Sequence, residues 1–429
     1  MMLTQAEQTT FAHTTRQVAV LRDLSYWVFA FQIFSLVFLQ KFALPVGKLP
    51  ISVPMITLYV CLAVLVLKSQ LYISPLRLTA VGLLFAVTLV TQITIRKPIS
   101  APSFLQFLLL YLPFLFVWRV SGEKYLKLMG VFQNAMIIAG AMVFVQLASQ
   151  MVLGLGNAPN LEIFVPHKFL LPGYNYAAPI TWGQKFVRPN GFFLLEPSFV
   201  SSFLASALII ELLFFHRLWR IIYYAAALLG VVAATGIVMT LIAAPLLLAR
   251  RNFRAAAVTG FAGIIGAIAA LATGAADLLL GRFSELGSPR SSAFQRLIAP
   301  LLYLRDVYVD PSKVLTGVGA GNSNEVGVSL WPVAKVMIEY GALSGIIFMI
   351  FLAICMGRSV NKPLALALFI TYNFTGGFLL VPITVIQILL LACLLQISVP
   401  QTFARGAAGR FSPVDQRRQG NRGAVPSPG

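Results

Sequence analysis

Apolar runs long enough to cross a lipid bilayer recur along the whole chain, and this feature limits the fold more than any other. A transmembrane helix needs about 20 mostly apolar residues, because the hydrocarbon core of a bilayer is about 30 Å thick. Only 10% of the residues are charged and 59% are hydrophobic, whereas about 25% of a soluble domain is charged. We therefore expect an all-α, polytopic integral membrane protein.

The apolar runs and the breaks between them predict the membrane spans. Single spans are expected at 24–40, 51–67, 78–95, 104–118, 128–153, 199–215, 255–273 and 333–356. Two longer regions, 221–249 and 363–397, lie between basic clusters, and the bias of Lys and Arg toward the cytoplasm favours a split in each. Thr235-Gly236 offers the first break, and Gly376-Gly377 with Pro382 offers the second. The prediction is about 12 spans, with both termini in the cytoplasm.

This topology divides the chain into a cytoplasmic N-terminal segment (1–23), a membrane domain (24–397) and a basic tail (398–429). The tail is rich in Gly, Arg, Pro and Ser, which is typical of disorder. Two outer segments are long, at about 154–197 and 274–332. Because long loops usually carry function, we expect the functional site there.

The net charge of +19 would suggest a nucleic-acid partner in a soluble protein. In a membrane protein the positive-inside bias explains most of this charge, so we expect no nucleic acid. Basic residues on the outer side are not explained in this way. They therefore become the candidates for binding an anion.

The first outer loop ends in "RPNGFFLLEPS", from Arg188 to Ser198, directly before a predicted span. Glu196 and Pro197 suit the first turn of a helix, whose N-terminus favours an acidic residue and proline. The position of Arg188 is not explained by a helix N-terminus in this way. Its guanidinium presents a fork of donors that matches the oxygens of a phosphate.

The second outer loop carries Arg290, Arg296 and Arg305. Apolar residues at helical spacing in "SAFQRLIAPLLYLRDVYVD" predict an amphipathic helix on the membrane surface, with a kink at Pro300 and an end at Asp310-Pro311. "GVGAGN" follows, with glycines at alternate positions, which lets a backbone approach a ligand or turn its amides toward an anion. A flexible turn is the alternative interpretation. These glycines are Gly317, Gly319 and Gly321.

Charged residues at the ends of two spans have structural and functional interpretations. Lys335 and Glu339 are four residues apart, so they share a helix face and are expected to pair, as a structural ion pair or as part of the site. Gly341 and Gly345, just beyond, are spaced for close helix packing. Glu211 is expected to lie at the surface at the cytoplasmic end of its span.

The outer loops contain no Asp-x-Asp or HExxH motif, so we expect neither a metal nor a cofactor. A reaction that displaces a pyrophosphate without a metal needs cationic side chains around the leaving group. Several outer arginines would serve that purpose.

The quoted residues resemble the O-antigen polymerase and ligase superfamily. The likeness runs from Arg188 to Phe351, through "RPNGFFLLEPS", "PLLYLRDVYVDPSKVLTGVGAGN" and "EYGALSGIIF". It implies a glycosyltransferase-C-like membrane enzyme that uses undecaprenyl-pyrophosphate-linked oligosaccharides at the outer face of the bacterial inner membrane. Among relatives, the chain is most similar to exopolysaccharide repeat-unit polymerases of the xanthan type. A flippase and a chain-length or export protein are the partners that such a system implies, besides the bilayer.

Three features separate the chain within this superfamily. Ligases carry a functional histidine in the second large loop, and residues 274–332 contain none, which favours a polymerase. The "TGSR" often found after the seventh span reads "TGIV" here, so the arginine that would contact phosphate is missing. Arg305 and Gly317 only approximate the polymerase arginine–glycine spacing.

The resulting hypothesis is that Arg188, Arg290, Arg296 and Arg305 surround the donor pyrophosphate. Glu196 is the first candidate for the general base, with Asp306 and Glu339 as alternatives, and orienting an arginine is the alternative role for Glu196. The competing functions are an O-antigen-type ligase and a lipid-linked oligosaccharide flippase or polysaccharide transporter. Transporters commonly show repeated halves and charges near the bilayer midplane, which this sequence lacks.

Overall fold

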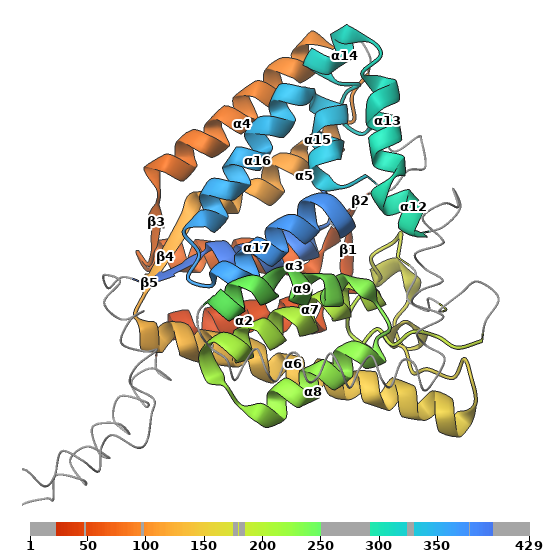
Figure 1. Cartoon of the computed structure of the whole chain (residues 1–429). Coiled ribbons are helices and arrows are strands. Elements are labelled where there is room, and N and C mark those ends of the chain that lie inside the picture. The colour runs from red at the N-terminus through yellow and green to blue at the C-terminus, as the bar shows by residue number, and fades with distance from the viewer. Residues whose placement is uncertain are drawn as a thin grey trace, which may run out of the picture.

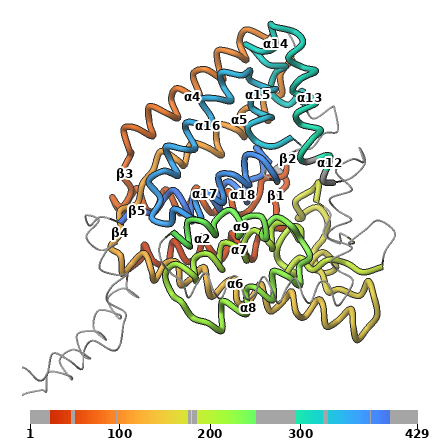
Figure 2. Tube along the Cα trace, viewed as in Figure 1, coloured from red at the N-terminus to blue at the C-terminus, as the bar shows by residue number. Residues whose placement is uncertain are grey.

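The computed structural model describes residues 23–46, 49–95, 98–174, 179, 185–249, 292–323, 330–376 and 378–397. Most of them lie in helices, with a few short strands (Figures 1 and 2). The elements of the first half are α2 (Leu24–Phe38), β1 (Ala43–Val46), β2 (Leu49–Ser52), α3 (Val53–Leu67), β3 (Leu71–Ile73), α4 (Pro75–Thr94), α5 (Ala101–Tyr111), β4 (Phe116–Val120) and α6 (Gly122–Leu153). Those of the second half are α7 (Pro197–Ile210), α8 (Leu218–Gly230), α9 (Ala234–Ala249), α12 (Ser292–Leu297), α13 (Ala299–Val307), α14 (Pro311–Thr316), α15 (Pro332–Tyr340), α16 (Ala342–Gly357), α17 (Lys362–Thr371), α18 (Pro382–Ile388) and β5 (Leu395–Ile397).

Short helical turns extend several of these helices. A 3-10 turn, η1 (Leu112–Leu115), follows α5, and two more lie in the first long loop, η2 (Leu161–Ile163) and η3 (His167–Phe169). Three π-helical turns follow helices directly: η4 (Glu211–Phe215) after α7, η7 (Tyr372–Gly376) after α17 and η8 (Leu389–Cys393) after α18. Such π turns are rare and frequently mark functional sites.

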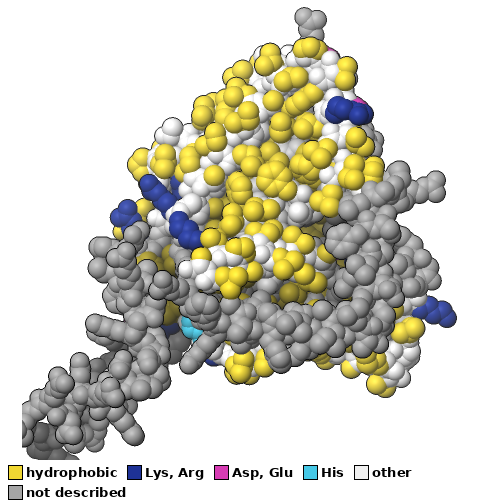
Figure 3. Space-filling view, in the orientation of Figure 1, with side chains coloured by type: hydrophobic (Ala, Val, Ile, Leu, Met, Phe, Trp, Pro, Cys, Tyr) yellow, Lys and Arg dark blue, Asp and Glu magenta, His cyan; other side chains and the backbone are white. Residues whose placement is uncertain are grey.

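The structure confirms a helical membrane-type protein. Within the described residues, three helices are long and apolar enough to cross a membrane: α4, α6 and α7 with η4. Large hydrophobic side chains are exposed along α4 and α16, and they cover much of one face, with Lys and Arg at its margins (Figure 3). An apolar surface of this size would be unfavourable in water but is expected against lipid. The apolar window of α7 is 72% buried, which places α7 at the centre of the bundle.

Both predicted splits are present. Residues 221–249 form α8 and α9, which meet at residues 231–233, a few residues before the expected Thr235-Gly236 break. Val232 there has a φ of 52°, which no helix interior accepts. Region 363–397 is divided into α17 with η7 and α18 with η8, and Pro382 begins α18 as its missing N–H allows.

Other span predictions need correction. The expected span 333–356 is broken at Gly341, where φ is 85° and the carbonyl of Leu315 would lie 2.1 Å from an added Cβ. Gly341 therefore admits the close approach of the α14 backbone, and Gly345 packs against the side chain of Met337. The expected span 104–118 stops being helical after Leu115 and continues as β4. The expected span 255–273 lies outside the described residues.

Glu211 is the clearest error of the sequence prediction. Its side chain is completely buried rather than at the surface. Nε and Nη2 of Arg217 donate to its two oxygens at 2.7 and 2.8 Å, and the Arg217 amide donates to Oε1 at 3.0 Å. His216 adopts the left-handed conformation between them, with φ 57°, and turns the chain back so that Arg217 reaches the carboxylate.

Arg77 ties distant segments of the bundle together. This arginine is only 1% exposed. It donates to the carbonyls of Phe116, Cys355 and Cys393 at 2.9, 3.1 and 2.8 Å. Phe116 begins β4, which pairs antiparallel with β3 and parallel with β5 in a small sheet (Figure 1).

Candidate functional site

The Pro189–Phe192 turn of the first motif is fixed by a buried glutamine on α6. The amides of Asn190 and Gly191 donate to Oε1 of Gln146 at 3.0 and 2.9 Å. Nε2 of Gln146 donates back to Oδ1 of Asn190 at 2.9 Å, and the same oxygen accepts from the Phe192 amide at 3.0 Å. Gly191 and Phe192 both have positive φ, 66° and 65°. This strained turn persists because its polar groups are satisfied on all sides.

One turn further along α6, Gln150 fixes the residue before Arg188. Its amide group exchanges two hydrogen bonds with the backbone of Val187, both 2.8 Å long. The backbone on either side of Arg188 is thus held by the buried side chains of Gln146 and Gln150. Arg188 is itself half-buried. A guanidinium placed in this way loses little further freedom when it binds an anion.

Glu196 follows eight residues later as the N-cap of α7. Its backbone carbonyl accepts from the amide of Phe199 at 3.0 Å, while its half-buried side chain is not used as a cap. Oγ of Ser198 donates to Oε2 of Glu196 at 3.5 Å. The carboxylate thus lies at the beginning of the central helix, next to the hydroxyl of Ser198.

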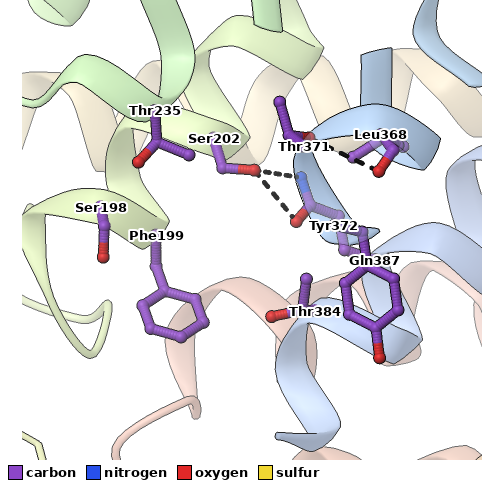
Figure 4. A pocket seen from close by; sticks show the side chains of 9 residues that line it. All are labelled: Ser198, Phe199, Ser202, Thr235, Leu368, Thr371, Tyr372, Thr384 and Gln387. Carbon is purple, nitrogen blue, oxygen red and sulfur yellow. Dashed lines mark hydrogen bonds between the residues drawn. The ribbon is translucent and has the colours of Figure 1, made fainter. Parts of the chain in front are cut away.

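A small pocket with many hydroxyl groups begins at Ser198, and we call it the hydroxyl pocket. In Figure 4, side chains of α7 face those of α17, η7 and α18 across it, and Thr235 closes it from α9. Its open interior measures about 30 Å³. The lining residues are Ser198, Phe199, Ser202, Thr235, Leu368, Thr371, Tyr372, Thr384 and Gln387.

A close crossing of α7 and α9 places Thr235 in this pocket. Gly236 lies so near α7 that an added Cβ would be 2.2 Å from the carbonyl oxygen of Ser201. The Gly236 amide donates to Oγ of Ser201 at 2.8 Å, and that hydroxyl donates to the Ala233 carbonyl at 3.0 Å. The "TGIV" segment therefore fixes a hydroxyl at the pocket, although it lacks the expected arginine.

The second outer loop reaches the same region through η7. Helix α12 packs against η7, which begins at the pocket residue Tyr372. Trp331, just before α15, contacts Phe374 of η7 with ring centroids 6.0 Å apart. The described parts of the two long loops lie on the same side of the bundle (Figure 1).

The predicted amphipathic segment forms two helices, α12 and α13, which separate at Ile298 as the proline at position 300 requires. Arg296 lies in α12, but its side chain is outside the described residues, as is Arg290 altogether. Arg305 and Asp306 lie near the end of α13, largely exposed, and pair with each other at 2.8 Å. Helix α13 packs on α15. The structure thus gives Arg305 a local partner, and no contact of the described residues joins it to Glu196.

The alternating glycines pack closely against other parts of the protein. All three have positive φ, and a Cβ at Gly317 would lie 2.5 Å from the carbonyl carbon of Glu339. The amide of Gly319 donates to the Glu339 carbonyl at 3.1 Å, and a Cβ at Gly321 would lie 2.6 Å from Cβ of Ser100. Gly317 and Gly319 thus let the loop pack on the end of α15, and Gly321 lets it pack on the beginning of α5. This close packing was not predicted from the sequence.

Lys335 and Glu339 form the expected pair, with Nζ and Oε1 3.5 Å apart. Glu339 is completely buried, and Oγ of Ser323 donates to the same Oε1 at 2.5 Å. Oε2 accepts no hydrogen bond within the described part of the chain. This carboxylate lies behind the glycine loop rather than at the hydroxyl pocket, so its position supports the structural interpretation.

Sequence reasoning missed a buried cation near the first motif. Lys41, in the turn after α2, is completely buried, and its carbonyl accepts from the Leu171 amide at 2.8 Å. Burial lowers the pKa of its ammonium to about 8, and the nearby Glu162 opposes that shift. Oε1 of the adjacent Gln40 accepts from the amide of Leu195, the residue before Glu196, at 3.4 Å. The turn after α2 thus supports the base of α7.

Comparison with known proteins yields no match: no family profile, no curated protein and no solved structure resembles the chain significantly. The function of the chain is therefore inferred from the site itself.

Proposed function

We propose that the chain is a membrane glycosyltransferase that polymerises undecaprenyl-pyrophosphate-linked oligosaccharide units into exopolysaccharide. It would act at the outer face of a bacterial inner membrane, with about 12 spans and both termini in the cytoplasm. One observation carries the proposal: Arg188 and Glu196 belong to a single clamped segment, which begins the central helix beside a hydroxyl-lined pocket. An anion-binding group, a carboxylate and a polar pocket are the parts that this transfer requires.

In the proposed reaction, a hydroxyl oxygen of the acceptor attacks the anomeric carbon of the donor sugar. A new glycosidic bond forms, and the bond from that carbon to the pyrophosphate oxygen breaks. Undecaprenyl pyrophosphate leaves with the electron pair, and Arg188 stabilises its growing charge, aided by arginines of the second loop. Glu196 takes the proton of the attacking hydroxyl.

Deletion of the gene, followed by analysis of cellular glycolipids, tests the class of function. A polymerase deletion is expected to accumulate single lipid-linked repeat units at the outer face. Units trapped at the inner face would instead identify a flippase, and full-length lipid-linked polymer would identify a ligase. Either of these results would contradict the proposal.

Point variants test the two residues. We expect Arg188→Ala and Glu196→Gln each to reduce polymer synthesis by roughly 100-fold or more, since removal of one transition-state contact commonly costs that much. Protein level and the pool of single-repeat glycolipid should not fall. Arg358→Ala is the matched control, because this exposed arginine follows α16 at the opposite end of the bundle. Full-length polymer from the Arg188 variant would refute the pyrophosphate role.

A further inference from the structure

The hydroxyl pocket differs from the rest of the bundle because polar groups from four helical segments converge on it. Six of its nine lining residues carry a hydroxyl or amide group on a Ser, Thr or Gln side chain, and no lining residue is charged. Three of the helices begin there: Ser198, Thr235 and Thr384 lie in the first turns of α7, α9 and α18. The pocket therefore lies at one end of these helices, and not at their middles.

Part of the lining is held rigidly. Nε2 of Gln387 donates to Oγ of Ser206 at 3.0 Å and to Oγ of Ser202 at 3.3 Å. Oγ1 of Thr371 donates to the carbonyl of Ala367 at 2.7 Å. These bonds fix one wall, as a binding site that orients its ligand requires.

Two hydroxyls of the lining have no such partner. Oγ1 of Thr235 and Oγ1 of Thr384 are half-buried and make no hydrogen bond within the described residues. Both hydroxyls are therefore open to a ligand that can donate to them or accept from them. The rings of Phe199 and Tyr372 supply apolar surface beside these hydroxyls (Figure 4).

The size of the pocket limits its ligand. An interior of about 30 Å³ holds about one or two water-sized groups, and not a sugar ring. A short polar arm that projects from a ring at the mouth would fit. The absence of lining charge favours a neutral arm over a carboxylate or a phosphate.

We propose that the hydroxyl pocket binds one neutral exocyclic substituent, a hydroxymethyl or N-acetyl group, of the acceptor sugar. The inference rests on the proposed function and adds to it the acceptor's position. Ser198 connects this pocket with Glu196, so a sugar anchored there presents its ring to the carboxylate that accepts its proton. The pocket thereby selects which acceptor sugar is extended.

Kinetics of the purified full-length protein in proteoliposomes provide the first test, with lipid-linked units extracted from the deletion strain as the probe. Thr235→Val and Thr384→Val should each raise KM about 5–10-fold with little change in kcat, as expected for the loss of one hydrogen bond to the ligand. Thr240→Val is the matched control, because this threonine of α9 donates to the Gly236 carbonyl within its own helix. Unchanged KM in both pocket variants would overturn the pocket assignment.

Cysteine labelling measures binding without turnover. The three native cysteines are all buried, so Thr384→Cys should add one accessible thiol. A small, membrane-impermeant methanethiosulfonate reagent should label it, and the extracted units should protect it about 5-fold or more, also when Glu196→Gln is combined with it. Labelling that the units do not slow would overturn the pocket assignment.

Failure of the pocket assignment can be distinguished from failure of the proposed function. If Arg188→Ala abolishes polymer while the threonine variants behave as wild type, only the pocket assignment fails. If the deletion strain accumulates no units and the wild-type protein does not polymerise its own lipid-linked material, the proposed function fails, and the pocket assignment fails with it.

Discussion

Glu211 and Glu339 are both completely buried, yet their carboxylates are compensated in different ways. Glu211 accepts two short bonds from Arg217 and a third from the Arg217 backbone. Glu339 has one short bond from Ser323, a longer 3.5 Å contact to Lys335, and an Oε2 that accepts no bond within the described chain. A buried carboxylate whose two oxygens both accept from one arginine stabilises the fold. Glu339 has one oxygen without such a bond among the described residues, so its charge is less fully compensated. Burial alone therefore does not identify a functional acid.

Replacing Arg217 and Lys335, the cations beside these carboxylates, should give the largest difference in unfolding free energy. Arg217→Met leaves a buried carboxylate without its bidentate partner, and we expect a loss of about 3–5 kcal/mol in unfolding free energy. Lys335→Met removes a single contact longer than a charge-assisted hydrogen bond, so we expect about 1–2 kcal/mol. Denaturation in detergent, followed by tryptophan fluorescence, measures both. Equal losses of unfolding free energy would show that the two cations stabilise their carboxylates to the same extent.

Lys41 extends the comparison to a buried cation. Its pKa is lowered by burial to about 8 in the folded protein, against 10.5 for the free side chain, and Glu162 opposes the shift. Between these two pKa values the folded state therefore binds fewer protons than the unfolded state, so the free energy of unfolding rises with pH. Below a pH of about 8 the destabilisation by the buried ammonium has its full value.

Lys41→Met should thus raise the unfolding free energy at pH 7 by on the order of 3 kcal/mol, and the gain should shrink as pH approaches 10.5. Thermal unfolding in detergent at several pH values measures this. Lys68→Met, at the exposed C-cap of α3, is the control and should show no such trend. A gain independent of pH would show that the ammonium is not the cause.

The loop behind Glu339 should give a smaller effect than Lys41. Gly317→Ala adds a Cβ 2.5 Å from the carbonyl carbon of Glu339, at a residue whose φ is 76°. We expect a loss of about 2 kcal/mol, because both the close contact and the backbone conformation oppose a side chain. Gly357→Ala, whose Cβ meets nothing within 4 Å, serves as the control in the same thermal unfolding measurement. If both variants unfold alike, the glycine loop is not held against α15.

Much of the fold could be predicted from apolar runs, and the breaks at Pro382 and near Thr235 followed from known helix-breaking chemistry. The break at Gly341 could not be predicted, since its cause is the carbonyl of Leu315 from a distant helix. Glu211 was mispredicted because a left-handed His216, which no periodicity indicates, folds Arg217 back.

The site was predictable only in part. The motif from Arg188 to Glu196 stands out because charge is rare in this sequence and the topology does not explain it. The hydroxyl pocket was missed because its polar residues lie on separate helices, where each single Ser or Thr is unremarkable. Only the close crossing at Gly236 and the return of α18 bring them together.

The buried Arg77 has a consequence for how the protein matures in the membrane. Two of the carbonyls that accept from its guanidinium belong to Cys355 and Cys393, which are 278 and 316 positions further along the chain, so a partly synthesised protein lacks these two acceptors. A buried charge without its full set of partners is unfavourable, so we expect Arg77 to reach its buried position only when the later helices arrive. Completion of synthesis and closure of the bundle are thereby coupled. A truncated copy would keep an exposed arginine that cellular quality control can recognise.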